Sequence, residues 1–169
     1  MSGVTTEGCS ASWLIVFLTH SPETQATCRA EIDAVIERKR NSHSQSRNDV
    51  FKTLSLHDWE HSFPYTLAAL REAVRLAMPG ATFRKNSSGR AVPIGNTGQT
   101  IPNGAYAAFL LDNVHMDPAL YPKPSKFDPE RYVAIDDQAK EEQPHTYIGW
   151  GSGRHPCGKH CYLLYSPSS

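Results

Sequence analysis

Several features that would assign this sequence to a functional class at once are scarce or absent. The apolar runs at residues 13–18 and 105–111 are far shorter than the roughly 20 residues that cross a bilayer, and no basic residue precedes the first of them as a signal peptide requires. Basic and acidic residues balance at 17 each, so no excess charge indicates a nucleic-acid partner. Four cysteines do not suggest a disulfide framework, and a reducing compartment is the default expectation. The sequence therefore favours a globular domain with no membrane anchor in this chain.

Helix signals dominate the first half of the chain. Ser21-Pro22-Glu23 is typical of a helix start, because serine caps, proline tolerates the first turn and an acid suits it. Ser55 and Asp58 indicate another capped start, and Pro79-Gly80 indicates a stop. The expected elements are an apolar helix over 6–20, a helix over 22–40 with Cys28 on its apolar stripe, a loop over 41–48, a short helix after 55 and a longer helix over 64–78.

The second half has a different character. Short β-like pieces are expected at 81–84 and 105–111, separated by glycine, proline and asparagine. Prolines then enforce an irregular, extended path over 117–129. We therefore predict a mainly α fold with small β-sheets, of the α+β class.

A glycine-rich segment around Cys157 carries the most chemical information. Its glycines let the backbone approach a flat ligand closely. Arg154, His155 and Lys159 make the surroundings electropositive, which favours a thiolate at Cys157. A thiolate beneath a haem iron donates electron density that promotes cleavage of the O–O bond.

This segment resembles the cysteine-ligand loop of the cytochromes P450, which are haem-thiolate monooxygenases. The loop has an aromatic residue, two residues, glycine, one residue, arginine or histidine, one residue, and cysteine. The glycine that usually closes the loop is Lys159 here, which is a departure. The resemblance implies that Cys157 is the axial ligand of a haem b iron and that His155 pairs with a haem propionate. The remaining loop residues that it assigns to haem binding are Trp150, Gly151 and Gly153.

Two further segments resemble the same family and occur in its order. Glu72 and Arg75 resemble the Glu-x-x-Arg signature, and residues 127–132 resemble the meander that contributes Arg131. An isolated Glu/Arg pair of this spacing is common on solvated helices, so its weight comes from the agreement with the other motifs. The resemblance implies a structural ion network of Glu72, Arg75 and Arg131, and a propionate contact for Arg84.

Residues 2–6 resemble the family's distal helix, which lines the oxygen pocket. Thr6 would be the catalytic threonine that hydrogen-bonds dioxygen and guides protons. Thr5 stands where an acid is common in the family, which is a second departure from its pattern. Helix capping is the alternative role of threonines at this position.

By this resemblance the chain is the C-terminal portion of a fungal-like cytochrome P450, incomplete as a fold. Residues 1–157 would form a partial family domain, and 158–169 a divergent tail. The implied reaction inserts one oxygen atom into a small organic or lipophilic substrate, with NADPH electrons arriving through an NADPH-cytochrome reductase. The parent family resides on the cytosolic face of the endoplasmic reticulum membrane, whereas this chain would be cytoplasmic if made. We expect the isolated chain to fold poorly and to be inactive or impaired.

Three alternatives stay open. Residues 153–159 match the start of a P-loop nucleotide site, although His160 replaces its hydroxyl ligand. A structural zinc site would use closely spaced ligands near the C-terminus, His155, Cys157, His160 and Cys161. The third alternative is a gene or transcript remnant that binds no haem. Cys9 and Cys28 are expected to be small core residues.

Overall fold

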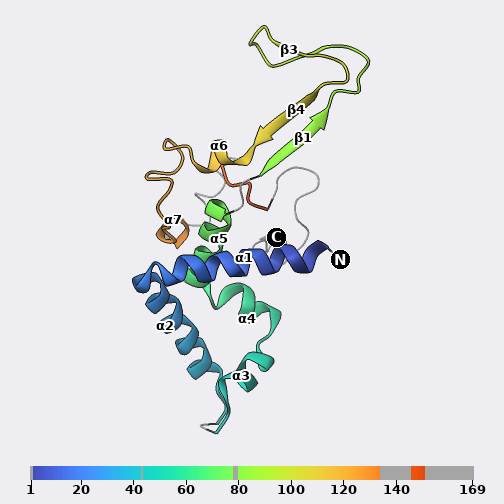
Figure 1. Ribbon diagram of the computed structural model, residues 1–169. Helices are drawn as coiled ribbons and strands as arrows, with labels where there is room; N and C mark the ends of the chain where they lie inside the picture. Colours follow the sequence, from blue (N-terminus) through green and yellow to red (C-terminus); the bar gives the residue numbers. More distant parts are fainter. Residues whose placement is uncertain (1, 43, 78–79, 134–145, 151–169) are drawn as a thin grey trace.

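A computed structural model describes residues 2–42, 44–77, 80–133 and 146–150 of the chain (Figure 1). Three long helices form the body: α1 (Ser2–Thr19), α2 (Pro22–Lys39) and α5 (Pro64–Ala77). Helix α1 packs against α2 and α5, and α2 also contacts α5. The three long helices expected from the sequence are thereby confirmed, with α1 beginning earlier than predicted.

A side chain of α2 caps the N-terminus of helix α5. The Glu31 carboxylate accepts hydrogen bonds from the backbone N–H groups of Tyr65 and Thr66, both at 2.8 Å. It also accepts from the Thr66 hydroxyl at 2.6 Å. A carboxylate satisfies the free N–H groups of a helix start and complements its positive dipole end. This contact fixes where α5 enters the core.

Two short helices, α3 (Arg47–Thr53) and α4 (Leu56–His61), lie between α2 and α5. The Ser55 hydroxyl accepts from the Asp58 N–H at 3.2 Å, and the Asp58 carboxylate accepts from the Ser55 N–H at 2.9 Å, which makes a reciprocal capping box. The expected loop over 41–48 is wrong at its end, because α3 begins at Arg47 with Ser46 as its cap. Ser21 precedes α2 as predicted, but its side chain makes no capping hydrogen bond.

The β structure is a ribbon that extends away from the helices (Figure 1). Strand β1 (Ala81–Lys85) pairs antiparallel with β4 (Tyr106–Leu110), and β2 (Val92–Pro93) pairs with β3 (Thr100–Ile101). Two short helices follow, α6 (Leu111–His115) at the base of the ribbon and α7 (Glu130–Val133) beside α5. The mainly helical fold with small sheets is as predicted.

The core lies where the long helices meet. Cys28 on α2 is buried as expected, whereas Cys9 on α1 is exposed, so its predicted place in the core is wrong. The aliphatic residues least exposed to solvent are Val35, Ile36, Val50, Ala69, Ala73 and Val74. Among the described helices, none combines the length and the apolar character that crossing a membrane requires.

Candidate functional site

Two charged side chains of α5 lie inside the protein. Glu72 is 0% exposed and Arg75 is 1% exposed. Nε and Nη2 of Arg75 each donate to one carboxylate oxygen of Glu72, both at 2.7 Å. Residues three apart share a helix face, and this two-bond pairing is the geometry that suits guanidinium and carboxylate. Although burial opposes the charge of Arg75, hydrogen bonding and attraction to Glu72 outweigh it and raise the pKa of Arg75.

Arg75 also holds the backbone of the segment that follows the ribbon. Its Nη1 donates to the carbonyl of His115 at the end of α6, and its Nη2 donates to the carbonyl of Pro124 at 2.6 Å. The guanidinium lies over the ring of Tyr121, with 4.7 Å between its Cζ and the ring centroid. One buried cation therefore ties α5 to two points of the chain that are distant in sequence.

Arg131 of α7 completes the ion network. Its Nε lies 3.3 Å from Oε1 of Glu72, and its Nη2 donates to the carbonyl of Lys123 at 3.0 Å. The Asp128 N–H donates to the same Glu72 oxygen at 3.2 Å. Lys123 has φ of 52°, a left-handed conformation that costs a residue other than glycine about 1–2 kcal/mol. The network fixes the meander at this strained point, and it brings together the three residues expected to form it.

Residues 146–150, the last described segment before Cys157, are tied down at three consecutive positions. The Tyr121 hydroxyl donates to the carbonyl of Thr146 at 2.9 Å. The Tyr147 hydroxyl donates to the carbonyl of Arg71 on α5 at 3.3 Å. The Ile148 N–H donates to Nε2 of His115 at 3.1 Å. The approach to the cysteine-containing segment is therefore held against α5 and α6.

Gly149 makes a close approach in the same segment. A Cβ at this position would lie 2.6 Å from the Tyr147 hydroxyl oxygen and 2.8 Å from Cγ1 of Val74. Such distances are well inside van der Waals contact, so any side chain would displace the segment from α5. Glycine is required here for lack of space, not for its backbone conformation.

A stack of rings and a guanidinium covers this contact. The Cζ atom of Arg71 lies 4.4 Å from the ring centroid of Tyr147 and 4.5 Å from that of Tyr132. Burial raises the pKa of both tyrosines well above its ordinary value, so the phenols stay neutral. The cation is thereby shared between two aromatic faces, which joins α7, α5 and the 146–150 segment.

Arg84, expected to contact a haem propionate, lies on β1 in the exposed ribbon. Its register partner is Ala107, and that of Thr82 is Phe109; cross-strand partners share a face, so Arg84 and Phe109 lie on the same side. Its Nη1 donates to the carbonyl of Phe83 at 3.0 Å. Within the described ranges it forms no ion pair with a carboxylate. A cation and an aromatic residue on the same side of the ribbon suit a ligand with an apolar body and an anionic edge.

The other expected site residues divide into two groups. Thr6 lies in the second turn of α1, which begins at Ser2, so it does not occupy the N-cap position. Trp150 is half-buried at the end of the 146–150 segment. Four residues, Gly151, Gly153, His155 and Cys157, lie outside the described residues, as do the candidate P-loop and zinc residues. Elsewhere in the described part, no cluster of three metal-binding side chains is present.

The comparison with protein families decides the assignment. A family model described as Cytochrome P450 matches residues 1–158. The chain belongs to the cytochrome P450 family. Cytochrome P450 monooxygenase AacuE of Aspergillus aculeatus is 33% identical over 144 residues, which cover 85% of this chain and 28% of that protein. Cytochrome P450 monooxygenase nsrP of Aspergillus novofumigatus is 32% identical over 131 residues, or 75% of this chain and 25% of that protein.

Solved structures of cytochromes P450 share the fold. A cyanobacterial CYP120A1 with bound retinoic acid has a TM-score of 0.65 and 26% identity, over 91% of this chain and 32% of that one. A zebra fish cytochrome P450 solved with progesterone has a TM-score of 0.64 and 23% identity, over 92% of this chain and 31% of that one; at that identity the likeness concerns the fold alone. The chain spans about a quarter to a third of the length of these cytochromes P450. The fungal monooxygenases agree with the fungal-like resemblance.

The described residues are compatible with haem in their donor chemistry. Arg84 offers a guanidinium without a carboxylate partner among the described residues, which suits a propionate. Gly149 brings the backbone close to α5 shortly before the segment that carries the cysteine, a haem ligand in this family. Sequence reasoning missed His115, Tyr121 and Tyr147, which anchor this approach. Their only signal was aromatic character near prolines, which does not specify partners that are 25, 33 and 76 residues away.

Proposed function

We propose that this chain provides the haem-ligating part of a haem-thiolate monooxygenase. In this proposal residues 1–157 are the family-like part and 158–169 a divergent tail. The observation that carries it is the anchored 146–150 segment: three hydrogen bonds hold it within eleven residues of Cys157. A haem ligand must be rigidly held and oriented to tune its metal, and the anchoring of the chain shortly before the cysteine supports the proposal.

The proposal gives each predicted site residue a role. Cys157 supplies the axial sulfur, and Arg84 and His155 neutralise the propionates. Thr6 holds a proton near the oxygen pocket on α1. Glu72, Arg75 and Arg131 hold the meander and do not touch the substrate. The remaining haem-binding residues of the loop are Trp150, Gly151 and Gly153, and the two glycines let the backbone approach a flat group closely.

The bound haem supplies the oxidising chemistry that inserts one atom of dioxygen into an organic substrate. Electrons would come from NADPH through a reductase of the NADPH-cytochrome type. The substrate class is a small organic or lipophilic molecule. By family, the site of action of the parent enzyme is the cytosolic face of the endoplasmic reticulum membrane.

A spectrum tests the proposal directly. We expect the chain, supplied with haem, reduced and exposed to carbon monoxide, to give the red-shifted Soret band of thiolate-ligated haem. Cys157→Ser should abolish this band. Cys161→Ser, four residues away, is the matched control and should keep it. Equal bands in both variants would show that another group binds the iron, and no band in the unmodified chain would exclude the proposed ligation.

Turnover by the chain alone is a separate question. Because the chain spans 28% of its relative AacuE, we expect little or no product when reductase, NADPH and oxygen are added. Product chromatography after incubation with lipophilic test substrates measures this. Sequencing the transcript on both sides of this region would show whether a longer enzyme exists.

A further inference from the structure

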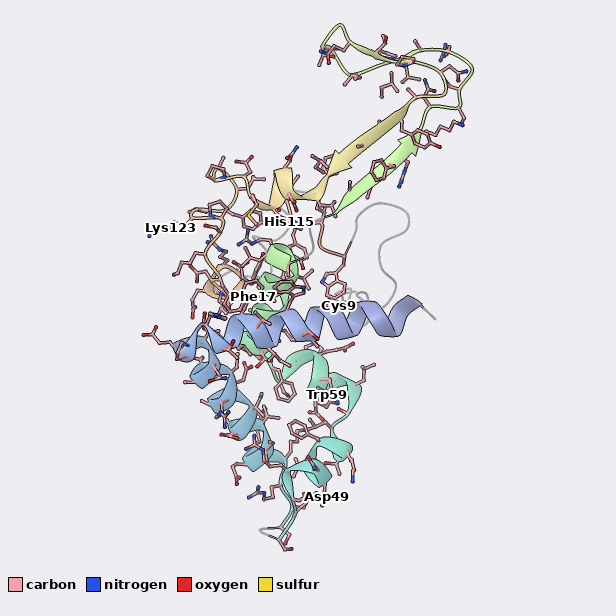
Figure 2. The ribbon with its side chains drawn as sticks, in the orientation of Figure 1. Cys9, Phe17, Asp49, Trp59, His115 and Lys123 are labelled. Carbon is pink, nitrogen blue, oxygen red and sulfur yellow. The ribbon has the colours of Figure 1, made fainter. Side chains whose placement is uncertain are left out.

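His115 connects the ion network to the segment that leads to Cys157. Its carbonyl accepts from Arg75, and its ring nitrogen Nε2 accepts from the Ile148 N–H at 3.1 Å. The residue is 0% exposed, so water does not compete for either bond. Figure 2 shows His115 and Lys123 on the same side of α1. Tyr121 makes a second such connection, because its ring lies under the Arg75 guanidinium and its hydroxyl donates to the Thr146 carbonyl.

The partner of Nε2 determines the state of the ring. A backbone N–H only donates, so Nε2 must present a lone pair and the single proton must be on Nδ1. The ring is therefore neutral in the tautomer that carries hydrogen on Nδ1. A protonated ring would direct one N–H at another and break the bond to Ile148.

Aromatic neighbours hold the ring in this orientation. The Tyr147 ring stacks on it with 5.5 Å between centroids and 23° between planes. The Tyr121 ring meets it edge-on at 6.4 Å and 87°. The buried Nδ1 has no hydrogen-bond partner among the described residues, so the bond to the Ile148 N–H is the hydrogen bond of the ring within that part of the chain. Stacking and one hydrogen bond thus fix a single ring position.

We propose that His115 is a positioning residue, whose neutral ring holds the Ile148 amide and thereby sets the direction in which the chain enters the Cys157 segment. The claim rests on the proposed haem ligation by Cys157. Tyr121 holds the carbonyl of Thr146 through its hydroxyl, Tyr147 ties its own side chain to the carbonyl of Arg71, and His115 holds the Ile148 N–H through an acceptor. Of these three anchors, only His115 binds a backbone N–H of the segment.

The surroundings of the ring favour its neutral form. Arg75 faces it from α5 with a full positive charge, and Glu72 behind Arg75 is already paired. Asp112 lies on α6 itself, and the neutral phenols of Tyr121 and Tyr147 pack on the ring. Burial first, and the Arg75 charge second, lower the pKa of His115. Because the ring stays neutral in these surroundings, Nε2 keeps its lone pair and can accept the hydrogen bond from the Ile148 N–H.

Two matched variants test the acceptor function in the full chain. His115→Gln keeps an acceptor oxygen near the position of Nε2, whereas His115→Phe keeps a ring without one. We expect hydrogen exchange of the Ile148 amide to be about tenfold faster in the Phe variant, as expected for the loss of one buried hydrogen bond, and close to unchanged in the Gln variant. Equal exchange in all three proteins would overturn the proposal. Ring ¹⁵N chemical shifts of the unmodified chain provide a check that needs no variant: a protonated Nε2 would also overturn it.

The haem spectrum separates this inference from the function on which it rests. With haem and carbon monoxide, His115→Phe should lose most of the thiolate band and His115→Gln should retain it. If the unmodified chain shows the band and the Phe variant keeps it in full, His115 does not position the ligand. If the unmodified chain shows no band while the Ile148 amide responds as expected, the proposed ligation fails and the positioning role falls with it, although the hydrogen bond itself stands.

Discussion

The buried ring of His115 makes stability depend on pH near neutrality. Its pKa is lowered in the folded chain, so below the ordinary histidine pKa of about 6.5 the unfolded chain binds the proton more readily. This contribution to stability is full above that value and is lost as pH falls toward the folded pKa. We expect the urea midpoint to fall between about pH 7.5 and about pH 5.5, and to fall less in His115→Gln. Identical shifts in the two proteins would assign the effect to another group.

Arg75 should be among the residues least tolerant of substitution. Arg75→Met leaves the buried Glu72 carboxylate without its two-bond partner, and breaking a buried pair in this way costs about 3–5 kcal/mol. The free energy of unfolding from urea titration measures the loss. Arg90→Met, at an exposed position of the ribbon, is the control and should change it by less than about 0.5 kcal/mol. A double variant, Glu72→Leu with Arg75→Met, should cost less than the single one, because the fully buried carboxylate is removed with its partner and only the partly exposed Arg131 loses an ion pair.

The sequence predicts some residue contacts and not others, for a physical reason. Glu72 and Arg75 lie three apart on a helix, so local geometry already places them together. Arg131 lies 56 residues after Arg75 in the sequence, so its place in the ion network was predicted from the order of the family motifs and not from helical spacing. The contact between His115 and Ile148 joins two segments whose relative position depends on how the entire meander packs, and no local pattern specifies that.

At the scale of elements, α4 depends on its first turn. Ser55→Ala removes one side of the capping box and should cost about 1 kcal/mol, with loss of helical signal at lower denaturant. Hydrogen bonding from Lys39, at 2.6 Å, and from Ser55 lowers the pKa of Asp58 well below its ordinary range. Its stabilising contribution is present above about pH 4 and is lost on further acidification.

The control for this element is Ser88→Ala, outside any helix, which should leave the helical signal unchanged. If Ser55→Ala leaves the urea midpoint and the acid transition as they are in the unmodified chain, the capping box does not stabilise α4.

The ends of helices agree with the sequence-based predictions where a local capping or proline signal was strong. Pro64 and Pro79-Gly80 bracket α5 as expected, and Ser55 starts α4. The short helices α3, α6 and α7 were not predicted, because helices of four to seven residues are held by neighbouring contacts more than by their own propensity. The Glu31 cap of α5 also escaped prediction, since it comes from another helix.

At the scale of the whole molecule, several of the described elements expose large apolar side chains. Two such surfaces are that of α1, with Ile15 62% exposed, and the ribbon of β1 and β4, with Phe83 60% exposed. Exposed apolar patches and unpaired strand edges promote association. We therefore expect the chain to self-associate at micromolar concentration and to bind an apolar dye, measured by sedimentation velocity and dye fluorescence.

Lysine substitution at these positions should reverse both effects without changing the fold. Ile15→Lys with Phe83→Lys places charges where side chains already meet water, so the far-ultraviolet circular dichroism should stay the same while the sedimentation coefficient falls to that of a monomer. Lys substitution of the buried Val74, which is 1% exposed, is the contrasting control and should unfold α5. A monomeric unmodified chain that binds no dye would contradict the expectation.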